Sequence, residues 1–422
     1  MRILVIGSGG REHAICHAFA RSEHVPTIFC APGNAGIAQV AELVPIKHDE
    51  IEALADFATR ERIDLTFVGG ETPLALGIVD EFETRGLKII GASKSAARLE
   101  ASKAFAKDFM LRYGVPTAAY RNARSPAEAV AILESGHFGA DLSPVVVKAD
   151  GLAAGKGVVV ARNRAEAIAA CNELAELVGI DAAEKIVLEE FLDGREVSLL
   201  MFVDGKDFAL MPPVRDHKRI GEGDTGPNTG GMGTITDSGL LTAAQTQQLM
   251  KEIIEPTLSG CTNEGFPFRG ILFLGLMMTD GGPKLLEYNV RFGDPETQAI
   301  LVRLETDLID ICKAMLDGKL VGTEIKWRDG NSACVVLAAD GYPQKPRVGD
   351  EISGLEEAVL VPNVTIFHAG TAFSGDRNVT AGGRVLGVTA TGATLDEALR
   401  TAYAAVDCIS WPRMQFRRDI GK

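Results

Sequence analysis

The sequence predicts an α/β protein of several domains, and three observations predict it. The chain has 422 residues, too many for one ordinary core, with 46% hydrophobic and 24% charged residues as in soluble globular proteins. Over the first hundred residues, short apolar runs alternate with segments of helical period. After about Glu324 the pattern becomes rich in β-type segments, with one late helix. We therefore expect an N-terminal parallel-sheet domain, a central unit and a small β-rich C-terminal domain.

The first hundred residues predict a parallel sheet with helical crossovers, because strands and helices alternate. Each expected strand runs into a loop of small residues, and such loops lie at the carboxyl edge of the sheet, where open α/β folds bind ligands. The expected strands are Ile3–Ile6, Thr27–Cys30, Leu65–Val68 and Lys88–Ile90, and the expected helices are Glu12–Ser22, Ile51–Arg60 and Leu74–Arg85.

A second unit follows a linker-like stretch, Arg121 to Pro126. Its helix begins after Asn163, a good N-cap residue, and a late helix begins with the capping box formed by Thr394 and Glu397. A mixed stretch of strands and glycine-rich loops lies between them. The expected strands of the second unit are Val145–Lys148, Gly157–Val160 and Ile186–Glu189, and the expected helices are Ala165–Val178 and one near Gln245–Ile254.

Composition excludes several classes of function. The net charge of −14 argues against a general nucleic-acid binder, which needs a basic face. No apolar stretch approaches the roughly 20 residues of a membrane span, and the N-terminus lacks a signal-like core. The seven cysteines form no CxxC pair and the histidines lack metal-site spacing, which indicates a reducing, cytoplasmic compartment and argues against a zinc enzyme.

The first glycine loop, Gly7-Ser8-Gly9-Gly10, invites a dinucleotide-binding interpretation that the neighbouring residues oppose. The full fingerprint requires glycine where Glu12 stands, and an acidic residue at the end of the second strand, which ends Cys30-Ala31-Pro32. An anion site at the start of the helix stays open, with Arg11 adding a charge-assisted contact. The alternative is a tight strand–helix turn without a ligand.

The second glycine loop, Lys148 to Gly157, resembles a P-loop but lacks two of its features. Gly157 stands where Ser or Thr should hold magnesium, and β-branched segments on both sides make this a loop between two strands. Such a hairpin loop can fold over a triphosphate through its backbone N–H groups. Lys148 and Lys156 would then neutralise phosphate charge. The alternative for either lysine is a solvated surface charge, although Lys148 ends an apolar strand.

The third motif is the strand that contains Glu287 and Asn289. Strand periodicity places both on one face and Tyr288 on the other. A carboxylate and an amide oxygen are ligands suited to Mg²⁺ that also binds phosphates. Arg291 shares this face and could stabilise a transferring phosphoryl group or an acyl phosphate. The alternative is a surface salt bridge between Glu287 and Arg291, but the apolar flanks favour a partly buried site.

The fourth feature is the basic cluster Arg215 to Arg219, followed by the glycine-rich tract Gly221 to Gly233. The cluster could bind a phosphorylated substrate, and the tract could be a loop that orders on binding. A solvated loop is the alternative that composition favours. His217 is either a general base or a structural donor.

Three segments together resemble the ATP-grasp superfamily: the loop Lys148 to Gly157 as its lid, the strand Glu189 to Leu192 as its hinge, and the strand that contains Glu287 and Asn289. Longer blocks resemble the phosphoribosylamine–glycine ligase family within that superfamily. The blocks follow one another in the family's order over essentially the whole chain. They are GSGGREH (Gly7–His13), APGNAG (Ala31–Gly36), KADGLAAGKG (Lys148–Gly157), DHKR (Asp216–Arg219), DTGPNTGGMG (Asp224–Gly233), RFGDPETQ (Arg291–Gln298), FHAGTA (Phe367–Ala372) and GGRVLGVTA (Gly382–Ala390).

The resemblance implies an N-terminal α/β domain (1–102), an ATP-grasp domain (103–325) with a mobile lid at about 121–190, and a C-terminal β-rich domain (326–422). It implies the ligation of glycine to 5-phosphoribosylamine with ATP and Mg²⁺ or Mn²⁺, through glycyl phosphate, in purine synthesis. A cytoplasmic monomer that binds neither nucleic acid nor membrane is expected. The competing interpretations are another ATP-grasp carboxylate–amine ligase and a non-catalytic nucleotide sensor.

The resemblance also implies residue roles on the nucleotide side. Lys103 and Lys148 would hold the ATP phosphates, Glu287 and Asn289 the metal, and Glu196 the ribose. The lid tip would be Gly155, Lys156 and Gly157, and the adenine hinge Glu189, Glu190, Phe191 and Leu192.

On the substrate side, Arg291 would stabilise the acyl phosphate, with Lys148 also catalytic, and Asp294 would hold the glycine ammonium. The phosphoribosylamine would contact Gly9, Gly10, Arg11, Asn34 and Glu71, with Asp216, Lys218 and Arg219 near it. Two departures from the family pattern stand out: the strand Ile271–Met278 carries no second metal carboxylate, and Gly70 replaces the usual proline before Glu71.

Overall fold

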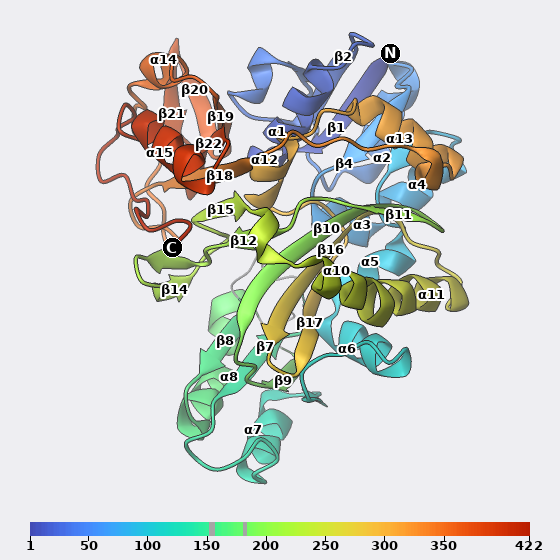
Figure 1. Cartoon of the computed structure of the whole chain (residues 1–422), viewed down its shortest axis with the longest axis vertical. Coiled ribbons are helices and arrows are strands. Elements are labelled where there is room, and N and C mark those ends of the chain that lie inside the picture. Colours follow the sequence, from blue (N-terminus) through green and yellow to red (C-terminus); the bar gives the residue numbers. More distant parts are fainter. Residues whose placement is uncertain (152–156, 180–183) are drawn as a thin grey trace.

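The computed structural model describes residues 1–151, 157–179 and 184–422. Its N-terminal part, blue in Figure 1, contains a parallel sheet. The strand order of this sheet is β3-β2-β1-β4-β5. All its ladders are parallel, as the alternation of strands and helices predicts. The short edge strand β3 is not signalled by the sequence, because its two residues are exposed. The strands are β1 (Arg2–Gly7), β2 (Thr27–Pro32), β3 (Glu42–Leu43), β4 (Leu65–Val68) and β5 (Ile89–Ile90).

The helices of this domain are α1 (Gly10–Ala20), α2 (Ile51–Arg60), α3 (Glu71–Leu76), α4 (Ile78–Thr84) and α5 (Lys94–Ala101). The prediction of one helix from Leu74 to Arg85 is wrong. Two short helices meet at Gly77, whose φ of +97° lies in the left-handed region that favours glycine and ends a helix. α3 begins at Glu71, shortly after the end of β4 at the carboxyl edge of the sheet.

The lid is an antiparallel sheet in the order β6-β9-β7-β8, covered by two helices and projecting from the rest of the molecule (Figure 1). The linker predicted from Arg121 to Pro126 is wrong, because β6 pairs with β9 there and α7 begins at Pro126. Asn163 caps α8 as predicted, accepting from the Glu166 N–H at 2.9 Å. The elements are β6 (Tyr120–Ala123), α7 (Pro126–Glu134), β7 (Val145–Ala149), β8 (Val158–Ala161), α8 (Arg164–Val178) and β9 (Ile186–Glu190).

The central and C-terminal parts share one large sheet, in which each ladder that joins the strands is antiparallel. Its order is β17-β16-β10-β12-β15-β18-β22-β19, with β11 also on β10. Strands on the two sides of residue 325, the predicted boundary of the C-terminal domain, therefore pair with each other through β15 and β18. The strands are β10 (Arg195–Asp204), β11 (Phe208–Leu210), β12 (Val214–Asp216), β15 (Gly233–Thr236), β16 (Arg269–Thr279), β17 (Gly282–Asn289), β18 (Asn331–Ala338), β19 (Val364–His368) and β22 (Arg384–Gly392).

Two hairpins stand outside this sheet: β13 (Arg219–Gly221) with β14 (Thr225–Asn228), and β20 (Thr371–Ser374) with β21 (Arg377–Thr380). Part of the glycine tract thus forms a hairpin rather than a featureless loop. Thr394 caps the last helix, but Glu397 accepts from the Ala393 N–H rather than completing the capping box. The helices are α6 (Lys103–Arg112), α10 (Ala243–Leu249), a π turn (Met250–Ile254), α11 (Glu255–Asn263), α12 (Glu296–Leu301), α13 (Leu308–Asp317), α14 (Leu355–Ala358) and α15 (Leu395–Val406), with single 3₁₀ turns at Ile37–Gln39, Ser238–Leu240 and Leu320–Gly322.

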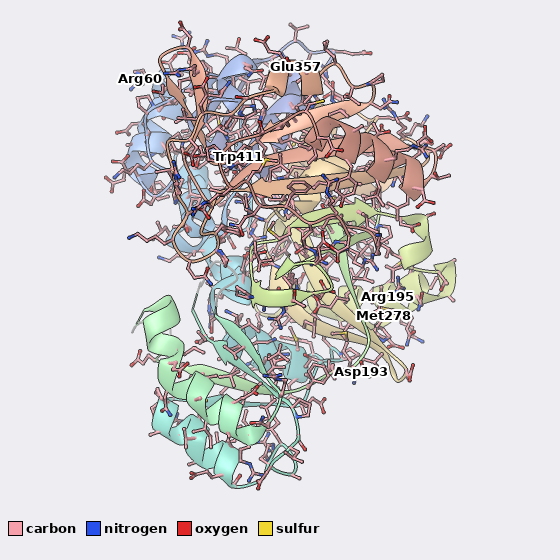
Figure 2. All side chains as sticks on the ribbon, turned by 90° about the vertical axis from the view of Figure 1, so that its left-hand side faces the viewer. Arg60, Asp193, Arg195, Met278, Glu357 and Trp411 are labelled. Atoms are coloured by element: carbon pink, nitrogen blue, oxygen red, sulfur yellow. The ribbon has the colours of Figure 1, made fainter. Side chains whose placement is uncertain are left out.

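The apolar cores join the N-terminal sheet to the large sheet on both faces. One face, including Leu4 and Phe29, packs in a cluster with Leu274 and Tyr288, and the other, including Phe67, packs with Phe292. In Figure 2 the ends of β10 and β16, marked by Arg195 and Met278, lie at the lid side of this body. Burial of this kind is the main stabilising term in folding, so it fixes the carboxyl edge of the N-terminal sheet against the end of β17. Among the described residues, no helix is both long and apolar enough to cross a membrane.

Candidate active site

Loops from distant parts of the chain converge at the end of β17. The carboxyl ends of β1 and β4 lie at one edge of the parallel sheet, and they present Arg11 and Glu71 there. Arg11 donates from Nη1 to the Phe292 carbonyl at 3.0 Å, and Arg291 donates to the same carbonyl at 3.2 Å. The segment after Glu287 and Asn289 therefore contacts the N-terminal domain. A ligand bound between the two domains would need this contact.

Arg291, just after β17, is held in one orientation by acids from two helices, α3 and α5. Its Nε lies 3.1 Å from the Glu71 carboxylate, and its Nη2 lies 2.6 Å from the Glu100 carboxylate and 3.2 Å from Asn289 Oδ1. Burial acts to raise the pKa of Glu71, but Arg291 and Arg11 outweigh it and lower that pKa to about 2. The guanidinium is thus fixed and charged beside the two expected metal ligands, which excludes the simple surface pair with Glu287.

Glu287 and Asn289 share one face of β17, and Tyr288 points into the core, where its hydroxyl bonds to Thr257 at 2.7 Å. Opposite Glu287 on β16 stands Gly275, whose missing side chain leaves room for the carboxylate: a Cβ there would lie 3.1 Å from Glu287 Cγ. Burial acts to raise the pKa of Glu287, yet Lys218, Lys148 and Lys103 outweigh it and lower the pKa. A charged carboxylate and an amide oxygen fit a hard divalent cation.

The lysines around Glu287 come from three separate parts of the chain: Lys103 from α6, Lys148 from β7 and Lys218 from the connection between β12 and β13. Lys103 begins α6 and donates from Nζ to the Gly151 carbonyl at 3.1 Å, and burial lowers its pKa. Lys148 lies in β7, and Lys218 forms a 2.9 Å ion pair with Glu196. Lys218 therefore lies with the predicted nucleotide-binding residues, not with the predicted phosphoribosylamine group. Several cations facing one carboxylate form a site that favours a polyphosphate anion.

The predicted adenine hinge splits into an inner and an outer set. Glu189 is buried and its carboxylate lies 2.7 Å from Lys148 Nζ and 2.9 Å from Lys107 Nζ. Glu190 points outward and accepts from the Ala119 N–H, while Phe191 is exposed. The exposed ring offers an apolar surface on which a base could stack. Gly157 closes the β7–β8 hairpin, whereas Gly155 and Lys156 lie outside the described residues.

The first turn of α1 binds carboxylates of the chain itself. The Gly9 N–H donates to Glu12 at 2.6 Å, Arg11 Nε donates to Glu12 at 2.7 Å, and the Arg11 N–H lies 3.4 Å from Asp294. Side chains at Gly7 and Gly69 would collide with Glu12. These glycines thus make room for Glu12, the residue that breaks the dinucleotide fingerprint, and the open anion site predicted at Gly9 and Gly10 already contains carboxylates.

Asn34 acts as a clamp between the first and last domains. Its Nδ2 donates to the Ser8 and His368 carbonyls, both at 2.8 Å, and its Oδ1 accepts from the Gly36 and Ile37 N–H groups at 2.9 and 3.0 Å. Both amide donors are therefore used within the chain. This geometry favours a structural role for the side chain over direct contact with a substrate.

We expect Asn34→Ala to lower the free energy of unfolding by about 3 kcal/mol, because four backbone groups, three of them in buried hydrogen bonds, lose their partner. Urea denaturation followed by circular dichroism measures this. Asn263→Ala, at an exposed position of α11, is the matched control and should change it by less than about 0.5 kcal/mol. Equal stability of the two variants would contradict the clamp.

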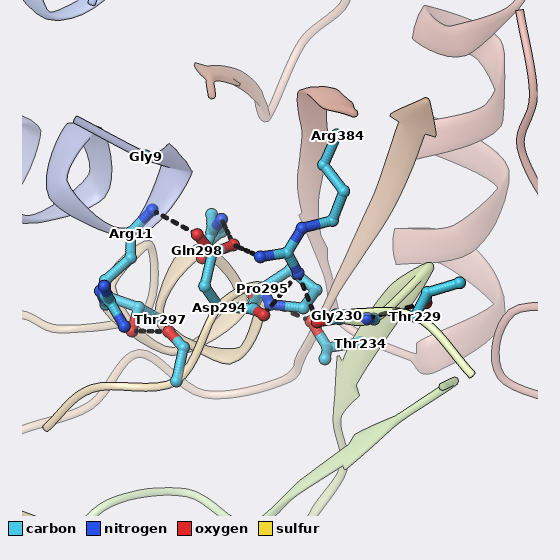
Figure 3. Close-up of polar contacts among 12 residues, drawn as sticks. Gly9, Arg11, Thr229, Gly230, Thr234, Asp294, Pro295, Thr297, Gln298 and Arg384 are labelled. Atoms are coloured by element: carbon cyan, nitrogen blue, oxygen red, sulfur yellow. Dashed lines mark hydrogen bonds and ion pairs between the residues drawn. The ribbon is translucent and has the colours of Figure 1, made fainter. Parts of the chain in front are cut away.

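Asp294 is positioned by the C-terminal domain (Figure 3). Its Oδ1 accepts from Gln298 Nε2 at 2.8 Å and lies 3.5 Å from Arg384 Nη2, while Arg384 Nη1 donates to the backbone carbonyls of Asp294, at 2.6 Å, and of Gly230. Burial acts to raise the pKa of Asp294, but Arg384 and Arg11 outweigh it and lower that pKa. The carboxylate is ionised, as a ligand for an ammonium group must be.

The remaining residues of the DHKR block point elsewhere. Arg219 donates to the Gly226 carbonyl at 2.7 Å within its own hairpin. Asp216 accepts from the His217 N–H, and burial together with Glu296 raises its pKa. His217 contacts the Gly233 carbonyl through Nδ1 and accepts from the Gly421 N–H through Nε2, both at 3.0 Å. Of the two roles open for His217, the structure favours the structural donor.

Models of one protein family match three consecutive parts of the chain. Residues 1–100 match the N domain of phosphoribosylglycinamide synthetase, residues 101–297 its ATP-grasp (A) domain, and residues 332–422 its C domain. The chain belongs to the phosphoribosylglycinamide synthetase family. The predicted resemblance and the predicted fold class are both confirmed.

Relatives of this phosphoribosylglycinamide synthetase family member share its full length. A phosphoribosylamine–glycine ligase of Mesorhizobium japonicum is 48% identical, covering 100% of this chain and 98% of the relative, and one of Salmonella typhimurium is 49% identical with the same coverage. The crystal structure of a Thermotoga maritima phosphoribosylamine–glycine ligase aligns over 100% of both chains, with a TM-score of 0.84 and 36% identity. A biotin carboxylase of Campylobacter jejuni shares the fold alone, with a TM-score of 0.73 and 17% identity over 98% of this chain and 92% of that one.

The sequence does not single out several residues that contact the site residues of this synthetase family member. Gln298 and Arg384 stand inside family blocks but carry no individual signal, and Glu12 draws notice only as a missing glycine. Glu100 and Lys107 lie in ordinary helical segments that carry no motif. The signal available for the first two is their place in the family blocks, whereas nothing local marks Glu100 or Lys107 as buried.

Proposed function

We propose that this chain ligates glycine to 5-phosphoribosylamine, using ATP, and releases glycinamide ribonucleotide, ADP and phosphate. The observation that carries the proposal is the fixed Arg291 guanidinium beside Glu287 and Asn289, at the point where the N-terminal loops meet the end of β17. Family membership and the names of the full-length relatives support the choice of substrates.

The chemistry has two steps. A glycine carboxylate oxygen attacks the γ-phosphoryl group of ATP, ADP leaves, and glycyl phosphate forms. The amine of phosphoribosylamine then attacks the glycyl carbonyl, and phosphate leaves with that carboxylate oxygen while the amine loses a proton. Arg291 would stabilise charge on the acyl phosphate, since a preorganised cation costs no reorganisation during the reaction. A closed lid would exclude the water that hydrolyses such an intermediate.

We propose Glu287 and Asn289 as ligands of Mg²⁺ or Mn²⁺, which would neutralise phosphate charge when bound. Lys103, Lys148 and Lys218 would surround the phosphates, with Glu196 at the ribose. The hinge would hold adenine through residues 189–192. These assignments follow from the cation cluster and the family pattern together.

On the substrate side, we propose Asp294 for the glycine ammonium. Gly9, Gly10, Arg11 and Glu71 would contact phosphoribosylamine. The domains proposed remain 1–102, 103–325 and 326–422, and we propose a cytoplasmic monomer.

The test is ADP release with ATP and Mg²⁺, with phosphoribosylamine generated in place and glycine compared with alanine, bicarbonate and no acid. We expect release only when glycine and phosphoribosylamine are both present. Release with bicarbonate would instead indicate another ATP-grasp ligase, and ATP binding without any turnover would indicate a nucleotide sensor.

A further inference from the structure

One buried carboxylate in the lid hinge is shared by two lysines. Glu189 lies 2.7 Å from Lys148 Nζ through one oxygen and 2.9 Å from Lys107 Nζ through the other. The side chains of Glu189 and Lys107 are 2% exposed and that of Lys148 is 8% exposed. Burying three charges is costly unless each one is paired, so each charge in this group depends on its partners.

The two lysines are anchored unequally. Lys107 Nζ also donates to Thr117 Oγ1 at 2.7 Å, and Thr117 in turn donates to the Leu285 carbonyl at 2.6 Å. The second contact of Lys148 is a long one, 3.5 Å to the Leu286 carbonyl. Lys107 is therefore fixed from α6, whereas Lys148 has one strong partner and faces the cation cluster around Glu287.

The charges in the group do not balance. Two lysines and one carboxylate carry a net charge of +1 in a place nearly closed to water, and the next carboxylate, Glu287, also faces Lys103 and Lys218. Burial and the neighbouring Lys148 lower the pKa of Lys107 to about 8, which reflects the cost of this extra charge. An anion that pairs with Lys148 would relieve that cost, provided that Glu189 keeps a counter-ion.

We propose that Lys107 is a positioning residue that keeps Glu189 neutralised while Lys148 exchanges this carboxylate for the phosphates of ATP. The inference rests on the proposed function, which brings ATP to Lys148. Without Lys107, movement of Lys148 toward a phosphate would leave a buried carboxylate unpaired, and such a charge is strongly unfavourable. Lys148 would then stay on Glu189.

The test compares the affinity of ATP with that of adenosine by calorimetric titration of the full chain. Adenosine would use the same proposed hinge but carries no phosphate. We expect Lys107→Met to weaken ATP binding about tenfold or more while adenosine affinity changes less than about twofold. Lys107→Arg keeps the charge and should retain most of the ATP affinity. An equal loss for both ligands, or an unchanged ATP affinity, would overturn the proposal.

A double variant separates the positioning role from a structural or direct one. Lys107→Met combined with Glu189→Gln restores the net charge of +1 and removes the carboxylate that holds Lys148. The ATP affinity of this double variant should therefore lie within about threefold of that of the Glu189→Gln variant. If Lys107 contacted the phosphates itself, its loss would weaken ATP binding in this background too, which would contradict the proposal. This comparison holds even if Lys107→Met alone fails to fold.

The result also stays separate from the proposed ligase activity. A wild-type chain that binds ATP through this group but releases no ADP with glycine and phosphoribosylamine would refute the proposed function and leave the counter-ion exchange intact. A wild-type chain that ligates glycine while Lys107→Met binds ATP normally would refute only the exchange.

Discussion

Arg291→Ala should lower kcat about a thousandfold, because it removes the preorganised cation expected at the acyl phosphate. Glu71 and Glu100 would also face each other without their shared partner, which adds repulsion at the same place. The measurement is steady-state ADP release at saturating glycine and phosphoribosylamine. The ATP concentration at half-maximal rate should change much less than kcat.

The matched control is Arg162→Ala, which removes an arginine that is 85% exposed in the lid and pairs with Glu166. It should leave kcat within about twofold, as surface ion pairs contribute little. Near-normal turnover of Arg291→Ala would show that Arg291 does not act on the reacting groups.

Glu287→Gln should raise the Mg²⁺ concentration needed for half-maximal activity about a hundredfold, because a neutral amide replaces the only carboxylate expected to bind the metal. The substitution keeps the shape of the side chain opposite Gly275, so the strand pairing should persist. The measurement is ADP release as a function of Mg²⁺ at fixed ATP, repeated with Mn²⁺.

Glu324→Gln is the control, since Glu324 is exposed and pairs with Lys326 on the surface. Its Mg²⁺ dependence should match that of the wild type. An unchanged Mg²⁺ requirement in Glu287→Gln would show that other residues bind the metal, and it would contradict the proposed role of Glu287.

Much of the fold could be predicted because the decisive signals are local. Buried parallel strands such as Leu65–Val68 read as apolar runs, and alternation along β17 placed Glu287 and Asn289 opposite Tyr288. The failures have local causes as well. Arg121 and Asn122 make β6 look like a linker, and the break at Gly77 depends on a left-handed backbone that a helical pattern does not signal.

The site was predictable as a set of motifs but not as a set of contacts. Lys107 reads as an ordinary helical lysine, and only the tertiary structure buries it against Glu189. Arg384 reaches Asp294 from 90 residues away in the chain, and Asn34 is saturated by partners as distant as His368. Local pattern carries no information on such pairings, so roles that depend on them require the folded chain.

The central claim, ligation through glycyl phosphate, is tested most directly by following the carboxylate oxygen of glycine. Glycine labelled with ¹⁸O in its carboxylate is incubated with the chain, ATP, Mg²⁺ and phosphoribosylamine, and the released phosphate is examined by mass spectrometry. We expect one ¹⁸O atom in each phosphate, because phosphate leaves with the oxygen that attacked ATP. Product formation with unlabelled phosphate would contradict the glycyl phosphate route.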